Sequence, residues 1–284
     1  MPSNSSPVWL EVALNGAAGR QFQPKIPITP DEIIAEGVAC AELGAAILHL
    51  HAYDADGAPT EDATIYERII EGIREKCDAI VYPTLALHGE LAERMAPLES
   101  LAAKGLLEMG VVDPGSVNLT HRMQVSAEVG GFVYQNPDAH IQRGLEHAQA
   151  EGWRPAYAIY EPGFARLGAA WAEKYPQLKT PVYRFMVSDH LLFGLSPSVK
   201  AIDFYHWHIA ATAPDAPWML SALDADITGV MDHALELGAH LRVGLEDAPF
   251  GSEQSNMDLV EYALQRISAS QRGLATPAEI RAAD

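Results

Sequence analysis

The stretch Ala45-Ala46-Ile47-Leu48-His49-Leu50-His51-Ala52-Tyr53-Asp54 combines an apolar run with two histidines at positions i and i+2. Its small and branched apolar residues predict a buried strand. Successive side chains on a strand point to opposite faces, so His49 and His51 would point the same way from one rigid edge. Two imidazoles on one face form part of a metal site that still needs one or two further ligands.

A second apolar strand runs directly into carboxylates, in the segment Leu241-Arg242-Val243-Gly244-Leu245-Glu246-Asp247. Glu246 would add an oxygen ligand to the two histidines. Two histidines and one carboxylate leave a coordination position open for water or substrate, which is typical of a catalytic zinc site. We therefore predict that these two strand ends, far apart in the sequence, meet in the fold.

The composition is that of a globular protein, with 284 residues of which 48% are hydrophobic and 20% charged. The sequence contains no apolar run of about 18 residues and begins without a basic and apolar leader. Cys40 and Cys77 are expected to be reduced, so we predict a cytoplasmic protein without a membrane span. Nineteen basic against 38 acidic residues give a net charge of −19, which argues against nucleic acid as a partner.

Strand-like and helix-like segments alternate along the chain with little left over. Strands are expected at Trp9–Leu14, the histidine segment, Ala79–Leu85, Leu106–Val112, Ala156–Tyr160, Val182–Val187, Asp203–Ile209 and His240–Leu245. Helices are expected from Thr29-Pro30 to Leu43, at Asp62–Lys76, Glu90–Lys104, Asp138–Glu151, from Gly163 to Lys174, at Ala225–Leu237 and Met257–Ser270, with a short one at Ala278–Ala283. This alternation predicts a parallel sheet covered by helices.

Eight such units in about 280 residues are typical of a (β/α)8 barrel. We expect one α/β domain over residues 1–284, a TIM barrel with a short C-terminal extension from about residue 274. The alternative is an open doubly wound sheet, but Asn15-Gly16-Ala17-Ala18-Gly19 matches its glycine-rich phosphate turn poorly. The active site of a barrel enzyme lies at the carboxyl ends of the strands. The expected ends carry these polar residues: Asn15, His49, His51, Thr84, Ser116, Glu161, Ser188, His208 and Glu246.

Arg242 lies four residues before Glu246 and would share its face of the strand, with Gly244 leaving space between them. A guanidinium inside a barrel needs an anion, which Asp247 or a substrate carboxylate would supply. An Arg–Asp pair beside a metal can hold an acid or accept a proton. A structural salt bridge is the alternative interpretation.

His206 and His208 form a second pair at positions i and i+2, in the expected seventh strand. By spacing alone they would bind metal equally well, but no carboxylate closes that strand. We interpret the segment as a packed aromatic strand in which only His208 lines the pocket.

Segments along nearly the whole chain are similar to one known family. They are Ile26–Ile33, Gly44–Ala52 followed by Asp54, Gly57 and Pro59, Gly115–Asn118, Arg242–Asp247, Ser255-Asn256 and Ala275–Glu279. With them the sequence resembles the β-keto acid cleavage enzymes, whose prototype is the 3-keto-5-aminohexanoate cleavage enzyme. The histidine segment and the Arg242–Asp247 segment together carry most of this resemblance.

The resemblance implies a (β/α)8 barrel with zinc, or a similar divalent metal, on His49, His51 and Glu246. It implies that a β-keto acid reacts with acetyl-CoA to give acetoacetate and the acyl-CoA of the shortened acid, activated by the dyad Arg242 and Asp247. It also implies a homotetramer. Substrate contacts are implied or expected at Ser116, Glu161, Asn15, Tyr53, Thr84 and His88.

The sequence departs from the family pattern around the expected substrate. Tyr82–Gly89 replaces a threonine- and glycine-rich segment, Tyr53 replaces a common arginine, and Asp189-His190 replaces a glycine-rich turn. The resemblance therefore does not predict the particular keto acid. Two other functions stay open: a metal-dependent hydrolase of the amidohydrolase type, and a family member that binds a small acid without catalysis.

Overall fold

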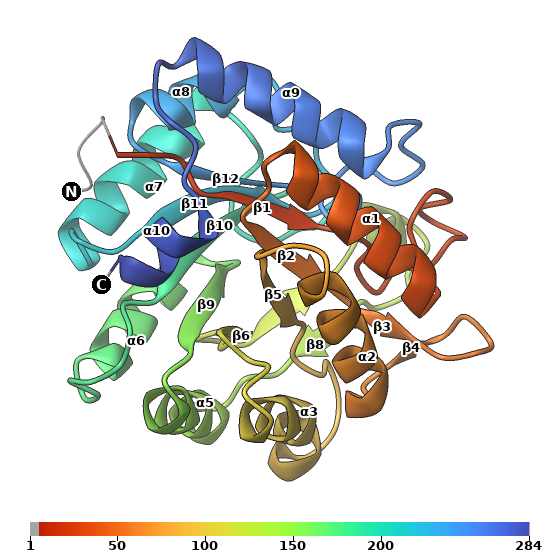
Figure 1. The fold of residues 1–284 in the computed structure, drawn as a ribbon. Helices are drawn as coiled ribbons and strands as arrows, with labels where there is room; N and C mark the ends of the chain where they lie inside the picture. Colours follow the sequence, from red (N-terminus) through yellow and green to blue (C-terminus); the bar gives the residue numbers. More distant parts are fainter. Residues whose placement is uncertain (1–5, 284) are drawn as a thin grey trace.

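The computed structural model describes residues 6–283 and has eight parallel strands surrounded by helices (Figure 1). The strands are β1 (Leu10–Ala13), β2 (Ile47–Leu50), β5 (Ile80–Pro83), β6 (Met109–Val111), β9 (Arg154–Ile159), β10 (Val182–Val187), β11 (Trp218–Ala222) and β12 (His240–Val243). Their order is β5-β2-β1-β12-β11-β10-β9-β6, and the two edge strands lie next to each other. This nearly closed barrel confirms the predicted fold.

Helices cover the outside of the barrel (Figure 1). Those between and after the strands are α1 (Pro30–Leu43), α2 (Ala63–Arg74), α3 (Leu91–Ala103), α5 (Asp138–Glu151), α6 (Pro162–Ala172), α7 (Val199–Thr212), α8 (Met231–Glu236) and α9 (Asn256–Ala269). The remaining elements are β3 (Ala52–Tyr53) with β4 (Pro59–Thr60), β7 (Val117–Leu119) with β8 (Phe132–Tyr134), α4 (Arg122–Ser126) and α10 (Pro277–Ala282). Within residues 6–283, every helix is too short or too polar to cross a membrane.

The start of α1 follows from local chemistry, as the sequence predicted. The Thr29 hydroxyl accepts a hydrogen bond from the Glu32 backbone N–H at 3.2 Å, and the Glu32 carboxylate accepts one from the Thr29 N–H at 2.9 Å. This capping box satisfies two N–H groups that the first turn leaves without partners. The hydrogen bond from Thr29 is also the main reason why the pKa of Glu32 falls to about 2.

The predicted seventh strand, Asp203–Ile209, is wrong because this segment lies inside α7. The Ser198 hydroxyl caps the helix by accepting from the Ala201 N–H at 3.2 Å. Buried residues at Ile202, Tyr205 and Ile209 follow a helical spacing rather than the alternation of a strand.

The strand that fills this place is β11, which the sequence did not predict. Trp218–Ala222 pairs with both β10 and β12, and the predicted helix at Ala225–Leu237 shortens to α8. Neither histidine of the second pair therefore lies on a barrel strand. A ring nitrogen of His208 lies 2.7 Å from the Pro162 carbonyl at the start of α6, so His208 packs between outer helices.

Strand β1 lies between β2 and β12 and sets how closely their ends approach. In the parallel register Ala13 lies opposite His49, while Glu11 lies opposite Arg242. Gly244, just after β12, has φ of 136°, and a Cβ there would lie 2.2 Å from the Ala13 carbonyl oxygen. Only glycine fits this conformation and this close approach, so it lets the chain after β12 turn across the end of β1.

We expect Gly244→Ala to lower the free energy of unfolding by about 2–3 kcal/mol, because the methyl group would meet backbone and the φ value is strained. Gly163→Ala is the matched control: a Cβ there meets nothing within 4 Å, and the residue lies in the first turn of α6. It should stabilise the protein by up to about 1 kcal/mol. Urea titration of both variants measures the difference, and equal effects would contradict this account of Gly244.

Candidate active site

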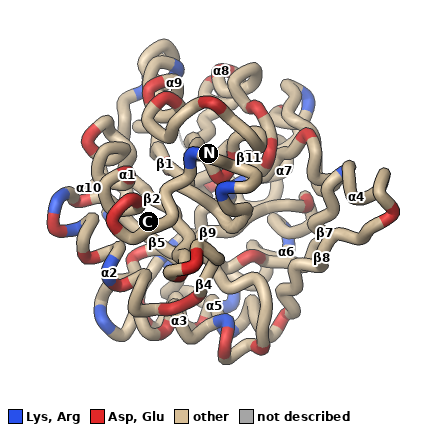
Figure 2. The backbone as a smooth tube through the Cα atoms, turned by 90° about the vertical axis from the view of Figure 1, so that its right-hand side faces the viewer, with Lys and Arg blue, Asp and Glu red and all other residues tan. Residues whose placement is uncertain are grey.

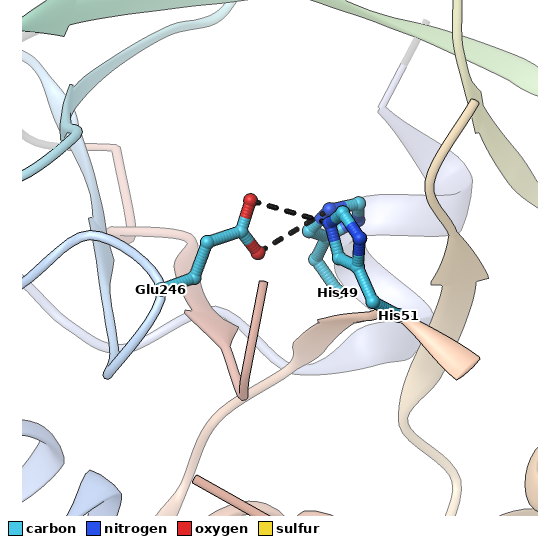
Figure 3. Close-up of side chains that lie close together, drawn as sticks. All are labelled: His49, His51 and Glu246. Atoms are coloured by element: carbon cyan, nitrogen blue, oxygen red, sulfur yellow. Dashed lines mark ion pairs between the residues drawn. The ribbon is translucent and has the colours of Figure 1, made fainter. Parts of the chain in front are cut away.

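His49, His51 and Glu246 come together at the carboxyl ends of β2 and β12 (Figure 3). His49 Nε2 lies 3.5 Å from Glu246 Oε2, and His51 Nε2 lies 3.5 Å from Glu246 Oε1. Ligand atoms of all three residues lie within 4.8 Å of one another. The two strand ends that the sequence singled out thus meet across β1.

The environment of these three residues fits a shared metal ion. Ligand atoms about 2.0–2.2 Å from a tetrahedral zinc lie roughly 3.4 Å apart, close to the spacing here. Among the described residues, the buried atoms His51 Nε2 and Glu246 Oε2 have no hydrogen-bond partner. Burial holds the pKa of His49 well below its ordinary value and so favours the neutral imidazole that binds metals. Burial opposes ionisation of Glu246, but Arg242 and the two histidines outweigh it and hold its pKa well below the usual range.

Asn15 anchors the strand end that carries the histidines. Its side-chain oxygen accepts from the His51 backbone N–H at 2.9 Å, and its amide nitrogen donates to the His51 carbonyl at 2.9 Å. The same nitrogen donates to the carbonyl of Pro27 at 2.9 Å. The contacts place Asn15 as a clamp on β2, and its predicted contact with substrate stays a prediction.

Three other predicted substrate residues lie in the segments that follow β2 and β5: Tyr53 in β3, and Thr84 and His88 after β5. The Tyr53 hydroxyl donates to the Gly16 carbonyl at 2.6 Å, and burial raises its pKa to about 12. Thr84 is buried just after β5. The His88 ring lies 5.5 Å from that of Phe132.

Ser116 and Glu161 are the residues to which the resemblance assigns substrate contacts. The Ser116 hydroxyl accepts from the Asn136 backbone N–H at 2.8 Å. Glu161, at the cap position of α6, accepts from the Gly194 N–H at 3.2 Å. Both polar groups thus order loops after the barrel strands, and their contact with substrate stays a prediction.

Arg242 contacts three carboxylates while being almost completely buried. Its Nη1 donates to Glu11 Oε1 at 3.0 Å, and its Nη2 lies 3.1 Å from Glu246 Oε1. Its Nε and Nη2 grip both oxygens of Asp247, at 2.9 and 2.8 Å. Burial raises the pKa of Asp247 to about 6, although Arg242 opposes this shift. This fork fixes the Asp247 carboxylate beside the three candidate metal ligands.

The barrel interior also holds polar residues that sequence reasoning did not select. The Tyr82 hydroxyl donates to Glu11 Oε1 at 2.6 Å and accepts from Arg184 Nη1 at 3.1 Å. Arg184 Nη2 lies 3.7 Å from Asp113 Oδ1. Glu11 and Arg184 interrupt otherwise apolar strands, and this was the signal that could have identified them.

Carboxylates outnumber guanidiniums around Arg242. Those of Glu11, Glu246 and Asp247 all meet this one guanidinium. Arg184 Nη1 lies 3.8 Å from Glu11 Oε1, and its Nη2 lies 3.7 Å from Asp113 Oδ1. A divalent cation at the histidines would add positive charge beside Glu246, which agrees with the donor set.

Comparison with known proteins shows which family the sequence matches. The sequence model of the beta-keto acid cleavage enzyme family matches residues 7–283. The 3-keto-5-aminohexanoate cleavage enzyme of Fusobacterium nucleatum is 27% identical over 270 residues, which are 92% of this chain and 91% of that protein. The 3-oxoadipate:acetyl-CoA acetyltransferase of Cupriavidus necator is 27% identical over 285 residues, covering 98% of this chain and 94% of the relative.

Among solved structures, the complex of ObcA with oxaloacetate is similar in fold. Its TM-score is 0.72 at 16% sequence identity, over 91% of this chain and 67% of that chain. At this identity the likeness concerns the barrel alone.

We expect Glu11→Gln to lower the free energy of unfolding by about 3 kcal/mol, because it removes a buried charge from between Arg242 and Tyr82. The control is Asp31→Asn, whose partner Arg68 lies 2.6 Å away in a pair with both side chains well exposed. Its effect should stay below about 1 kcal/mol. Denaturant unfolding followed by circular dichroism compares the two, and a Glu11 variant as stable as its control would contradict the assigned role.

Proposed function

The chain belongs to the beta-keto acid cleavage enzyme family, and we propose that it transfers acyl groups between a β-keto acid and acetyl-CoA. The products would be acetoacetate and the acyl-CoA of the shortened acid. One observation carries the proposal: His49, His51 and Glu246 converge beside the Arg242–Asp247 pair at the carboxyl end of the barrel. The printed names of the relatives, which include acetyl-CoA transferases, support acetyl-CoA as the co-substrate.

The proposal includes a divalent metal, zinc above all, held by His49, His51 and Glu246. Two imidazoles and one carboxylate are a donor set of catalytic zinc sites, and the three carboxylates around Arg242 favour a further cation beside them. When bound, the metal would act as a Lewis acid for the keto group and its enolate.

The protein groups beside the ligands have distinct roles in this proposal. Asp247 accepts the proton from the carbon between the keto and carboxylate groups of the substrate. Arg242 grips Asp247 through two nitrogens and thereby fixes the direction from which the base approaches. The guanidinium also offsets the negative charge that the substrate carboxylate brings into the barrel.

The atoms balance over two carbon–carbon bond changes. The carbanion attacks the thioester carbonyl of acetyl-CoA, a carbon–carbon bond forms, and CoA leaves as its thiolate. The thiolate then attacks the original keto carbon, and the adjacent carbon–carbon bond breaks. This releases the new acyl-CoA and the carbanion of acetoacetate, which takes back the proton that Asp247 accepted.

The hydrolase alternative finds less support in the described chain. An amidohydrolase-type site expects the histidine pair on the first strand and a histidine after the fifth. Here the pair lies at the end of the second barrel strand, β2, while Tyr160 and Glu161 follow β9.

The homotetramer implied by the resemblance is part of the proposal. Within residues 117–134, the arm formed by β7, α4 and β8 extends away from the barrel (Figure 2). It exposes large apolar side chains to solvent, at Met123, Val125, Val129, Phe132 and Val133. Apolar surface gathered on one arm is typical of contact sites, so burial against further copies of this chain would account for it.

Turnover is tested with a panel of β-keto acids, each incubated with acetyl-CoA and the zinc-loaded protein. Mass spectrometry of the CoA products should reveal an acyl-CoA one acetate unit shorter than one of the acids, together with acetoacetate. Formation of free CoA alone would point to thioester hydrolysis. No new acyl-CoA from any acid would refute the proposed function.

The metal is tested by His49→Ala, with His206→Ala on α7 as the matched control. His49→Ala removes one of three ligands, so bound zinc measured by plasma mass spectrometry should fall at least about tenfold, and activity should fall with it. The His206 variant should keep both. Chelation should abolish activity in the wild type, and zinc should restore it. Full zinc content in the His49 variant would show that the metal binds elsewhere.

A further inference from the structure

A cavity of about 260 Å³ lies between the segments that follow β11 and β12. Its walls include Ile227 and Met231 from the first segment, Val243 at the end of β12, and Leu259 and Tyr262 of α9. Helices α8 and α9 pack on β12 and on each other (Figure 1). The cavity therefore lies on the helix side of β12, at the barrel end where the active site is.

The cavity borders the proposed reaction centre. Asp247 forms part of its wall, and this carboxylate is held by Arg242 at 2.8 Å. The same guanidinium nitrogen lies 3.1 Å from Glu246. One side chain thus separates the cavity wall from a candidate metal ligand, so a ligand in the cavity would have one end close to the reacting atoms.

The lining selects against anions. Lysine, arginine and histidine are all absent from the described residues that line the cavity, whereas Asp226 and Asp247 are present. Keto acids and phosphate groups are both anionic and would gain no charge-assisted hydrogen bond there. The apolar walls and the polar side chains of Thr228, Ser252 and Gln254 suit a neutral chain with amide groups. The volume lies just below the roughly 300 Å³ of the smallest common ligand pockets, so it fits a slender arm rather than a whole nucleotide.

We propose that this cavity receives the pantetheine arm of acetyl-CoA, an inference that rests on the proposed function. The arm is the neutral, amide-containing part of the co-substrate, and it carries the thioester at its end. The nucleotide with its phosphates stays outside the cavity. The keto acid enters separately over the strand ends, where Arg242 and the metal ligands lie.

The test narrows the cavity by Thr228→Trp and compares it with Thr212→Trp. Thr228 is half-buried in the cavity wall, and Thr212 is half-buried at the far end of α7, outside the cavity. Calorimetry measures the binding of acetyl-CoA, S-acetylpantetheine and acetoacetate to the zinc-loaded proteins. Thr228→Trp should weaken binding of both thioesters by at least about tenfold and leave acetoacetate binding within about twofold. Thr212→Trp should match the wild type throughout.

Ser252→Trp, in the part of the lining that follows β12, repeats the measurement if melting curves show that the Thr228 variant is unfolded. Wild-type affinity for the thioesters in a folded cavity variant would overturn the inference. An equal loss of acetoacetate binding would overturn it too, because the cavity would then serve both substrates. Neither result tests the proposed function, which is refuted only if the wild type makes no acyl-CoA from any keto acid.

Discussion

The buried guanidinium of Arg242 is the interaction on which the rest of the site depends. It meets carboxylates from β1 and from the segment after β12. An unpaired buried charge lowers the stability of the folded state by several kcal/mol, and each charged group of the cluster offsets this loss for its partners. These ion pairs also fix the geometry of the site, because the planar guanidinium can bind three carboxylates in only a few arrangements.

The same network links the barrel interior to the metal ligands. The Tyr82 ring lies 4.7 Å from the His49 ring, while its hydroxyl bonds to Glu11 beneath Arg242. Asn15 and Gly244 fix the backbones of β2 and β12 above this layer. His49 lies in β2, and His51 and Glu246 lie within three residues of the ends of β2 and β12. The ligands are therefore held close to the rigid sheet, as a preorganised site requires.

Charge is distributed unevenly between the interior and the outside. Acidic and basic residues are interspersed over the outer elements (Figure 2), and the net charge is −19. Against this background, Arg242 together with the proposed metal would supply the local positive charge for an acid at the barrel mouth, and the net charge gives no long-range attraction for anions. The described residues that line the cavity beside β12 include no lysine, arginine or histidine. Separate surroundings for an anionic acid and a neutral thioester arm would let the two substrates bind without competing.

Local sequence signals determined most of the architecture. The start of α1 at Thr29-Pro30, the apolar strands and the histidine pair at the end of β2 follow from residue types and spacing alone. The misassigned strand shows the limit: Asp203–Ile209 is apolar and aromatic enough to suit either a strand or a helix. Only the pairing of Trp218–Ala222 with strands on both sides decides which segment enters the sheet.

The sequence by itself thus determined a (β/α)8 barrel of a recognisable family and the residues around a candidate metal site. Tertiary structure decided that Glu11 and Arg184 face inward and compensate Arg242 and Asp113. It also decided that the Asn15 side chain binds the backbone of His51. His208, finally, lies outside the barrel. The physical reason is that inward or outward orientation depends on the register between strands that are distant in the chain, and no local pattern encodes that register.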